Sequence, residues 1–223
     1  MVDVEGPSTA KQDASNMLIG YQQAIFPMAD CRDAKQFHWF TCEQRGIIPL
    51  HQFHVPKSLK KKIKKGCYSL SVNQHVEEML RHCAQREDGS WISYRLEKAY
   101  EELNQQGHLL SVEVSYDGSF SGGLFGVFIR GAFFGESMVS LQPDSSKIAL
   151  THLVAALQLA GFNLLDTQTT TSHLERFGQR IISSDDYQKI LEQALDRQPI
   201  SLKKQLVATT EQNFMATWLA KVN

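Results

Sequence analysis

Two polar residues stand at the end of an expected strand, and they could act together. Asp166 closes a short apolar stretch, residues 162–166, and Gln168 follows two positions later. Side chains two positions apart on a strand point to the same face, so we expect Asp166 and Gln168 to lie together. Glu136 ends another expected strand, residues 132–136. From the residues alone, a polar turn after a strand is the more ordinary explanation for Asp166 and Gln168.

A second feature is a dense group of lysines, six within nine residues: Lys57, Lys60, Lys61, Lys62, Lys64 and Lys65. Pro56 opens this segment at a position typical of the first helical turn, and Leu59 and Ile63 give the helix a narrow apolar side. The net charge of the whole chain is only -1, so the remainder is acidic. The helix could bind phosphates, lie on an anionic membrane or present a solvated face, and two apolar residues are few for a membrane surface.

The composition predicts a soluble globular protein. The chain has 223 residues, 42% of them hydrophobic and 21% charged, without the run of about 18 apolar residues that a membrane span needs. We see no signal peptide, and the cysteines show no CxxC spacing and no nearby histidine in metal-ligand register: Cys31, Cys42, Cys67 and Cys83. We therefore expect a cytoplasmic protein with free thiols, no bound metal and no membrane partner.

The order of the expected elements indicates an α+β fold. Residues 1–16 resemble a flexible tail. The periodicity predicts helices at 17–24, 57–65, 76–84, 97–106, 148–160 and 184–197, and strands at 36–40, 45–50, 110–116, 123–130, 132–136 and 162–166. Asp117-Gly118 is a hairpin signal, so the central strands should form an antiparallel meander. We place no elements beyond residue 197.

Several short motifs, in order and at matching spacing, make the sequence resemble the leucyl/phenylalanyl-tRNA–protein transferases between about residues 17 and 197. The motifs are Ala24–Pro27, Ser90–Ser93, Ala99-Tyr100 with Leu103 and Gly107, Ser111–Glu113, Phe133–Met138, Ser146-Lys147 with Ala149-Leu150, and Asp166–Gln168. Any one of them could occur by chance, but chance does not explain seven motifs in the right order over this length.

This resemblance implies a small N-terminal domain with the basic helix, residues 17–66, and a catalytic domain like the acyl-CoA N-acetyltransferases, residues 67–223. The implied activity is transfer of Leu or Phe, and sometimes Met, from aminoacyl-tRNA to proteins that begin with Arg or Lys, which marks them for degradation. The reaction is aminolysis of an activated ester, and it requires no metal or other cofactor. We expect a monomer.

The resemblance also implies roles for individual residues. Asp166 would orient the Gln168 amide against the attacking amine, and Glu136 would hold the cationic residue of the acceptor. An amide is a very weak base, so positioning by Gln168, with substrate or water carrying the proton, is chemically easier than proton abstraction. His173 also matches a histidine of relatives.

Further residues match the family's binding surfaces. The hydrophobic amino-acid pocket would be lined by Leu124, Phe133, Leu150, Leu153 and Leu157, with Trp91 as an aromatic neighbour. Met28 stands where a tryptophan is usual, so a stacking surface is lost. The tRNA would be bound by Lys57, Lys61, Lys64 and Lys65.

The sequence also leaves two other functions open. A tRNA-binding module that has lost transfer activity would keep the same fold, and Met28 is the reason to consider it. An acyl-CoA-dependent N-acyltransferase would share the fold too, but the meander is not followed by a clear Gly-rich pyrophosphate loop.

Overall fold

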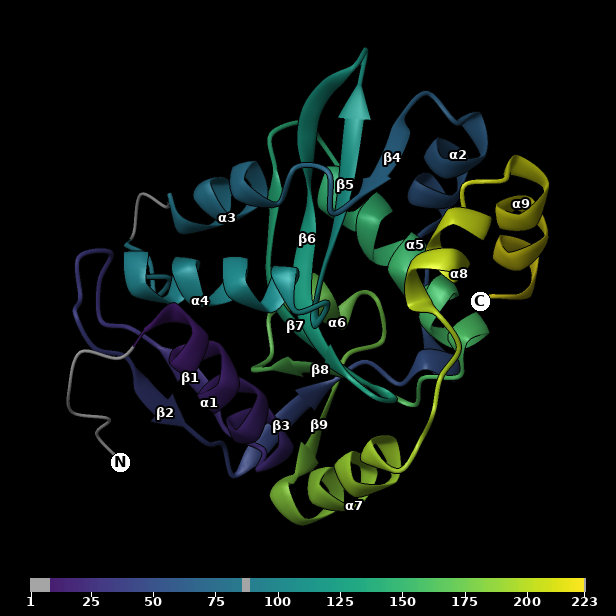
Figure 1. Cartoon of the computed structure of the whole chain (residues 1–223). Coiled ribbons are helices and arrows are strands. Elements are labelled where there is room, and N and C mark those ends of the chain that lie inside the picture. The colour runs from purple at the N-terminus through teal and green to yellow at the C-terminus, as the bar shows by residue number, and fades with distance from the viewer. Residues whose placement is uncertain (1–8, 86–88, 223) are drawn as a thin grey trace.

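A seven-stranded mixed sheet runs through the computed structural model, which describes residues 9–85 and 89–222 (Figure 1). The strand order is β4-β5-β6-β7-β8-β3-β9. The bounds of these strands are β3 Gln44–Ile47, β4 Ser69–Val72, β5 Leu109–Tyr116, β6 Ser119–Ile129, β7 Ala132–Ser140, β8 Leu164–Gln168 and β9 Arg180–Ser183. The mixed sheet with helices on both faces confirms the α+β class.

Strands β5, β6 and β7 form the expected antiparallel meander, and β4, which was not predicted, pairs antiparallel with β5. Strands β5 and β6 are joined by a tight turn in which Asp117 and Gly118 have positive φ angles of 50° and 75°. Two successive positive φ values suit the right-handed twist of a hairpin, and Asp-Gly adopts them readily. The local sequence at this turn therefore favours the observed pairing of β5 with β6.

The other half of the sheet joins distant parts of the chain. Strand β8 runs parallel to β7, with Phe134 opposite Asp166, after a crossover through helix α5, Ser145–Ala160. Strand β3 then lies antiparallel between β8 and β9. This arrangement places residues from the first quarter of the chain beside the end of β8.

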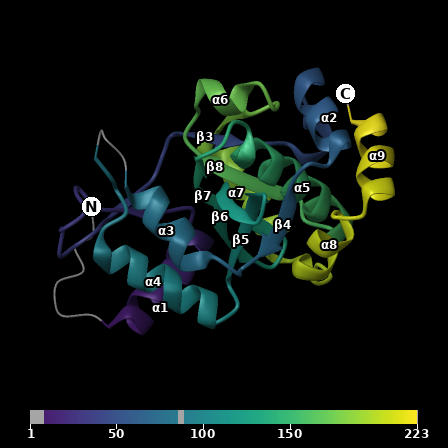
Figure 2. The same cartoon turned by 90° about the horizontal axis from the view of Figure 1, so that it is seen from above.

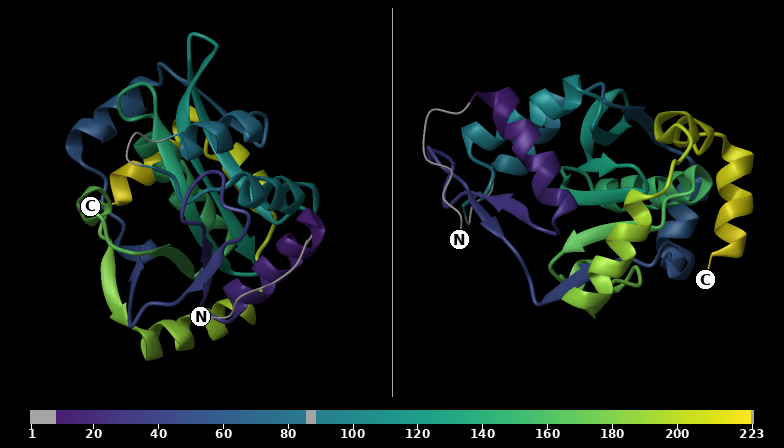
Figure 3. Two further views of the ribbon diagram at one scale, coloured as in Figure 1. Left: turned by 90° about the vertical axis from the view of Figure 1, so that its left-hand side faces the viewer. Right: turned by 60° about the horizontal axis from the view of Figure 1, so that its bottom comes forward.

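Helices cover both faces of the sheet, as Figure 2 shows from above. One face is covered by α5, with α2, α8 and α9 on the same side, and the other by α1, α3 and α4. Helix α7 packs beside β3, β8 and β9 (Figure 3). The bounds are α1 Ala10–Gln22, α2 Lys57–Lys65, α3 Val76–Ala84, α4 Tyr94–Gln105, α6 Ser172–Glu175, α7 Ser184–Leu195, α8 Leu202–Ala208 and α9 Gln212–Lys221, with a short 3-10 helix at Leu50–Gln52 and a two-stranded sheet of β1, Phe26–Met28, and β2, His38–Phe40.

Helix α1 corrects the expected tail. Residues 10–16 are helical, so the prediction of a tail over residues 1–16 is wrong for that part, and residues 1–8 lie outside the described residues. Thr9 caps the helix by accepting a hydrogen bond from the Gln12 amide, and the buried Asp13 carboxylate pairs with Arg95 of α4 at 2.7 Å. The helix ends at Gln22 rather than at residue 24, because Ala24 has a positive φ of 63°.

The expected domain boundary at residue 66 lies between α2 and β4. Segments before it belong to the same sheet and core as segments after it, since β3 lies in the main sheet and Leu59 and Ile63 of α2 pack in one cluster with Leu153. Beyond residue 197, where we placed no elements, α8 packs against α5 and α9 packs against α2. No helix in the described part of the chain is long and apolar enough to cross a membrane.

Candidate active site

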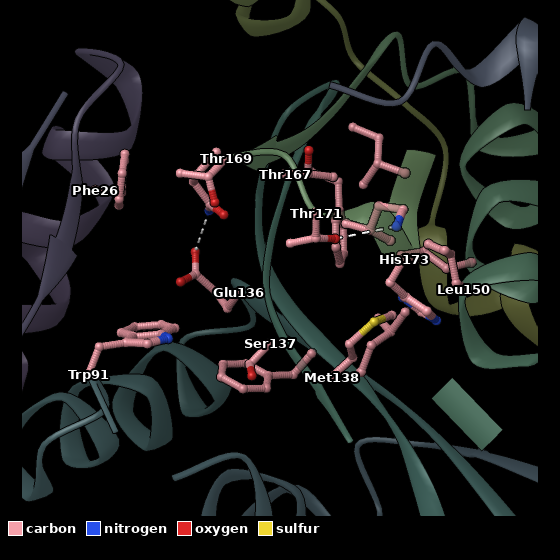
Figure 4. Close-up of a pocket in the computed structure, with 18 of the residues that line it drawn as sticks. Phe26, Trp91, Glu136, Ser137, Met138, Leu150, Thr167, Thr169, Thr171 and His173 are labelled. Carbon is pink, nitrogen blue, oxygen red and sulfur yellow. Dashed lines mark hydrogen bonds between the residues drawn. The ribbon is translucent and has the colours of Figure 1, made fainter. Parts of the chain in front are cut away.

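A cavity of about 460 Å³ opens beside the end of β8. Its walls come from strands β1, β6, β7 and β8, helix α5 and the segment around α6. In Figure 4, Trp91 and Glu136 lie toward one end of the cavity, whereas Met138, Leu150 and His173 lie toward the other. The cavity therefore has one end with a carboxylate and an aromatic ring and one end that is largely apolar.

Most of the predicted pocket residues meet at this cavity. They are Met28, Trp91, Leu124, Phe133, Glu136, Leu150, Leu153 and Gln168, and His173 also lines it. Leu157 does not, and that expectation is wrong: its side chain is fully buried in the core one helical turn beyond Leu153. Helical spacing brings Leu150, Leu153 and Leu157 to one face of α5, but only the N-terminal part of that face reaches the cavity.

Two phenols hold the Glu136 carboxylate. The Tyr21 hydroxyl donates to one oxygen at 2.8 Å, and the Tyr100 hydroxyl donates to the other at 2.7 Å. Burial raises the pKa of Glu136 to about 7, although the two phenol hydrogen bonds act to lower it. Burial also raises the pKa of both phenols well above the ordinary value, so they remain protonated donors.

A cation, a phenol and a backbone amide surround Asp166, whose side chain is fully buried. Arg45 approaches it side-on, with Nε 3.0 Å from Oδ1 and Nη2 2.7 Å from Oδ2. The Tyr187 hydroxyl donates to Oδ2 at 2.7 Å. Burial opposes the charge of Arg45, but the adjacent Asp166 carboxylate outweighs burial and raises the pKa of Arg45. Both side chains of this ion pair are almost inaccessible to solvent.

Asp166 acts on the backbone of Gln168 and not on its side chain. The Gln168 amide N–H donates to Asp166 Oδ1 at 2.8 Å, and Gln168 has a positive φ of 53°. The turn separates the two side chains, so the expectation that they share one face is wrong: Gln168 lines the cavity and Asp166 does not. The Gln168 side-chain amide instead donates to Glu136 Oε1 at 3.5 Å, as the dashed line at Glu136 in Figure 4 shows.

Sequence reasoning missed four residues that hold these carboxylates: Tyr21, Arg45, Tyr100 and Tyr187. A charged residue at the start of the apolar run 45–50 was a usable signal for Arg45, since an arginine buried in a sheet needs an anionic partner. Tyr100 lies within a motif that carried the family resemblance. The sequence around Tyr21 and Tyr187 contains no comparable signal, because each partner is distant along the chain.

The lysines of α2 divide into two groups. Lys60 donates to the Val222 carbonyl, and Lys62 pairs with Asp144 at 3.2 Å. The side chains of the other four, Lys57, Lys61, Lys64 and Lys65, are exposed and make no ion pair or hydrogen bond with described residues. These four are the predicted tRNA-binding lysines.

A short series of charged groups joins α2 to the cavity. Asp144, which pairs with Lys62, also accepts a hydrogen bond from Lys147 at 2.7 Å. His173 of the cavity lies close enough to Lys147 and Arg176 for both cations, after the larger effect of burial, to lower its pKa. Within the described residues, no group of three or more His, Cys, Asp or Glu side chains is placed to hold a metal ion.

The comparisons with known proteins agree with one another. A family model described as leucyl/phenylalanyl-tRNA protein transferase matches residues 47–192. The leucyl/phenylalanyl-tRNA–protein transferase of Maricaulis maris is 44% identical over 185 residues, which is 82% of this chain and 86% of the relative. Those of Gluconobacter oxydans and Paramagnetospirillum magneticum are 44% and 43% identical, over 80% and 82% of this chain and 81% and 88% of their own lengths. The family match includes Glu136, Asp166 and Gln168, and this chain belongs to the leucyl/phenylalanyl-tRNA–protein transferase family.

Proposed function

We propose that this chain transfers Leu or Phe from aminoacyl-tRNA to the N-terminal amine of an acceptor protein. Its family membership supports the reaction. The observation that carries the proposal for this chain is the cavity, in which Glu136 and Gln168 face each other beside an apolar end formed by Leu150, Leu153 and Met138. The side chain of the transferred Leu or Phe fits the apolar end of the cavity. The ester carbonyl of the aminoacyl-tRNA then lies beside Glu136 and Gln168.

Each group at the cavity has a role in this proposal. Aminolysis needs the amine and the ester held in a reactive geometry, and such positioning is worth up to about 7–11 kcal/mol in intramolecular reactions. The Gln168 side-chain amide contacts the attacking amine, and Asp166 fixes the Gln168 backbone that carries it. Trp91 and Met28 lie at the cavity for contact with the terminal nucleoside. Acceptors that begin with Arg or Lys bring a cation that suits Glu136, and their modification would mark them for degradation.

The four unpaired lysines of α2 are proposed to bind the tRNA backbone. Charged side chains that contact phosphates provide affinity without reading the base sequence, and their binding weakens with salt. Because one chain supplies both the cavity and these lysines, we expect it to work as a monomer, in the cytoplasm where charged tRNA is found.

One transfer assay tests the activity. Labelled Leu-tRNA, Phe-tRNA and Met-tRNA are each incubated with peptides that begin with Arg, Lys or Ala. We expect Leu or Phe to be joined to the Arg and Lys peptides and not to the Ala peptide. Binding of aminoacyl-tRNA without any transfer would instead identify a binding module, and transfer only from an acyl-CoA donor would identify an N-acyltransferase.

A charge reversal tests the tRNA surface. The double substitution Lys61→Glu and Lys65→Glu should weaken tRNA binding and reduce the slope of log affinity against log salt by about 1 to 2, as expected for two lost phosphate contacts. Lys11→Glu with Lys189→Glu, on α1 and α7, is a control with the same change in net charge. Equal losses in the two double variants would show that only the net charge matters and that α2 is not the binding surface.

A further inference from the structure

Glu136 is placed to do more than hold a cationic acceptor. Among the described residues that line the cavity, it is the only carboxylate. Its two oxygens accept hydrogen bonds from neutral donors, Tyr21, Tyr100 and Gln168, and it forms no ion pair with a described residue. A carboxylate that faces a substrate cavity without a cation of its own has capacity to bind an ammonium group and to receive its proton.

We propose that Glu136 accepts the proton of the acceptor's α-ammonium group and so generates the neutral amine that attacks the ester. This inference rests on the proposed transfer reaction and deepens it, because it names the base.

His173 lies toward the other end of the cavity from Glu136, and the remaining polar groups near the reacting centre are poor candidates for the base. Gln168 carries an amide, which does not accept a proton near neutral pH. The Asp166 carboxylate is occupied by Arg45, Tyr187 and the Gln168 backbone, and it does not line the cavity. The phenols have raised pKa values and act as donors.

The charged and titratable groups around Glu136 come from four elements. Tyr21 of α1 and Tyr100 of α4 donate to it, and at longer range Asp166 of β8 and Arg45 of β3 act on it with opposite signs. Burial is the largest influence and brings the pKa of Glu136 to about 7. A general base is most effective when its pKa lies near the operating pH, and this environment meets that condition.

With Glu136 as the base, each proton that leaves the amine has an acceptor. The α-ammonium gives one proton to the Glu136 carboxylate and becomes a neutral amine. The amine nitrogen attacks the ester carbonyl carbon, the C–N bond forms, and the carbon–oxygen bond to the tRNA ribose breaks. The second nitrogen-bound proton passes to the leaving ribose oxygen, and protonated Glu136 releases its proton to water.

The main test compares wild type with Glu136→Gln in single-turnover transfer from pH 5.5 to 9, with a peptide that begins with Arg. We expect the variant to lose about 10²- to 10⁴-fold in rate at pH 7. An analogue of the peptide in which an aminooxy group replaces the α-amine is already neutral at pH 6. With this analogue the variant should recover to within about tenfold of wild type.

A role confined to holding the acceptor's side chain gives a different result. In that case Glu136→Gln would raise KM for peptides that begin with Arg or Lys, and the aminooxy analogue, which keeps the same side chain, would not rescue it. That result would overturn the inference while leaving the transfer activity of the wild type intact. Absence of transfer by the wild type itself would overturn the proposed function instead.

A second pair of variants tests the base without removing it. Tyr21→Phe and Tyr100→Phe each delete a donor that lowers the pKa of Glu136. Each should therefore shift the acid limb of the rate profile to higher pH. An acid limb that stays in place in both variants, with wild-type melting temperatures, would show that another group is the base.

Discussion

Two carboxylates on neighbouring strands of this sheet have opposite surroundings. Asp166 on β8 is fully buried beside a guanidinium, a phenol and a backbone N–H. Glu136 on β7 is bound by two phenols and a distant side-chain amide, and its carboxylate faces a cavity. Both are acids in short motifs of one family, but Asp166 is paired with a cation, whereas Glu136 is held by neutral donors and burial raises its pKa to about 7.

The hydrogen-bond and ion-pair partners of a buried carboxylate decide whether it stabilises the structure or can accept and release a proton. An acid paired with a buried arginine can anchor a strained turn, here the positive φ at Gln168. An acid held only by hydroxyl groups in a buried position has its pKa moved toward neutrality. Three predictions test this distinction.

The largest effect should follow removal of Asp166. Asp166→Ala leaves the buried Arg45 cation without its partner, so we expect the free energy of unfolding to fall by about 3–5 kcal/mol. Glu136→Gln keeps one oxygen that accepts a phenol hydrogen bond, and its NH2 group can donate to the oxygen of the other phenol, so it should change the free energy of unfolding by only about 1 kcal/mol or less. Urea denaturation followed by circular dichroism at pH 7.5 measures both. Similar losses of unfolding free energy in the two variants would show that Asp166 and Glu136 do not differ in their contribution to stability.

A smaller effect should separate the phenols that bind the two acids. Tyr187→Phe deletes a hydrogen bond to a carboxylate that is paired with Arg45 and should cost about 1.5–3 kcal/mol of unfolding free energy. Tyr21→Phe deletes a bond to a partly protonated one and should cost about 1 kcal/mol. If Tyr187 acts through Asp166, its substitution in the Asp166→Ala background should cost clearly less than in the wild type, and the same denaturation experiment measures this.

The smallest effect concerns pH. The pKa of Glu136 is raised in the folded protein from its ordinary 4.5 to about 7, so the folded state binds the proton more tightly than the unfolded state. The free energy of unfolding should therefore fall as pH rises from about 4.5 to 7 and then level off. We expect a change on the order of 1 kcal/mol, since water reaches the carboxyl from the cavity. Glu136→Gln should lack this pH-dependent component. If the difference in unfolding free energy between wild type and Glu136→Gln does not change with pH, the raised pKa of Glu136 is contradicted.

Local patterns predicted those elements whose stability is local. Helix α3 has the predicted bounds, Val76–Ala84, because its apolar residues recur at helical spacing. The start of α1 was missed because small and polar residues fill its first turns, and its buried Asp13 is stabilised by Arg95, which lies 82 residues away. No window of the sequence contains both halves of that ion pair.

The same limit applies to the candidate site. Motif order singled out Glu136 and Gln168, and the structure brings both to one cavity. The alternation of a regular strand predicted that Asp166 and Gln168 share a face, and it failed because the Asp166 carboxylate stabilises a left-handed turn at Gln168. Residues such as Arg45 and Tyr187 become recognisable only when the sheet brings them to Asp166.

The insertion of β3 between β8 and β9 also determines when the site can form during synthesis. Arg45 is made 121 residues before Asp166, and β3 pairs with segments near residues 168 and 181. Contacts so distant along the chain form slowly, because a long loop must close before they are made. The meander and its helices can therefore assemble on a growing chain while Arg45 still lacks its anion. A chain that stops before residue 183 retains most of its sheet but lacks the complete set of strands that holds Gln168 in place.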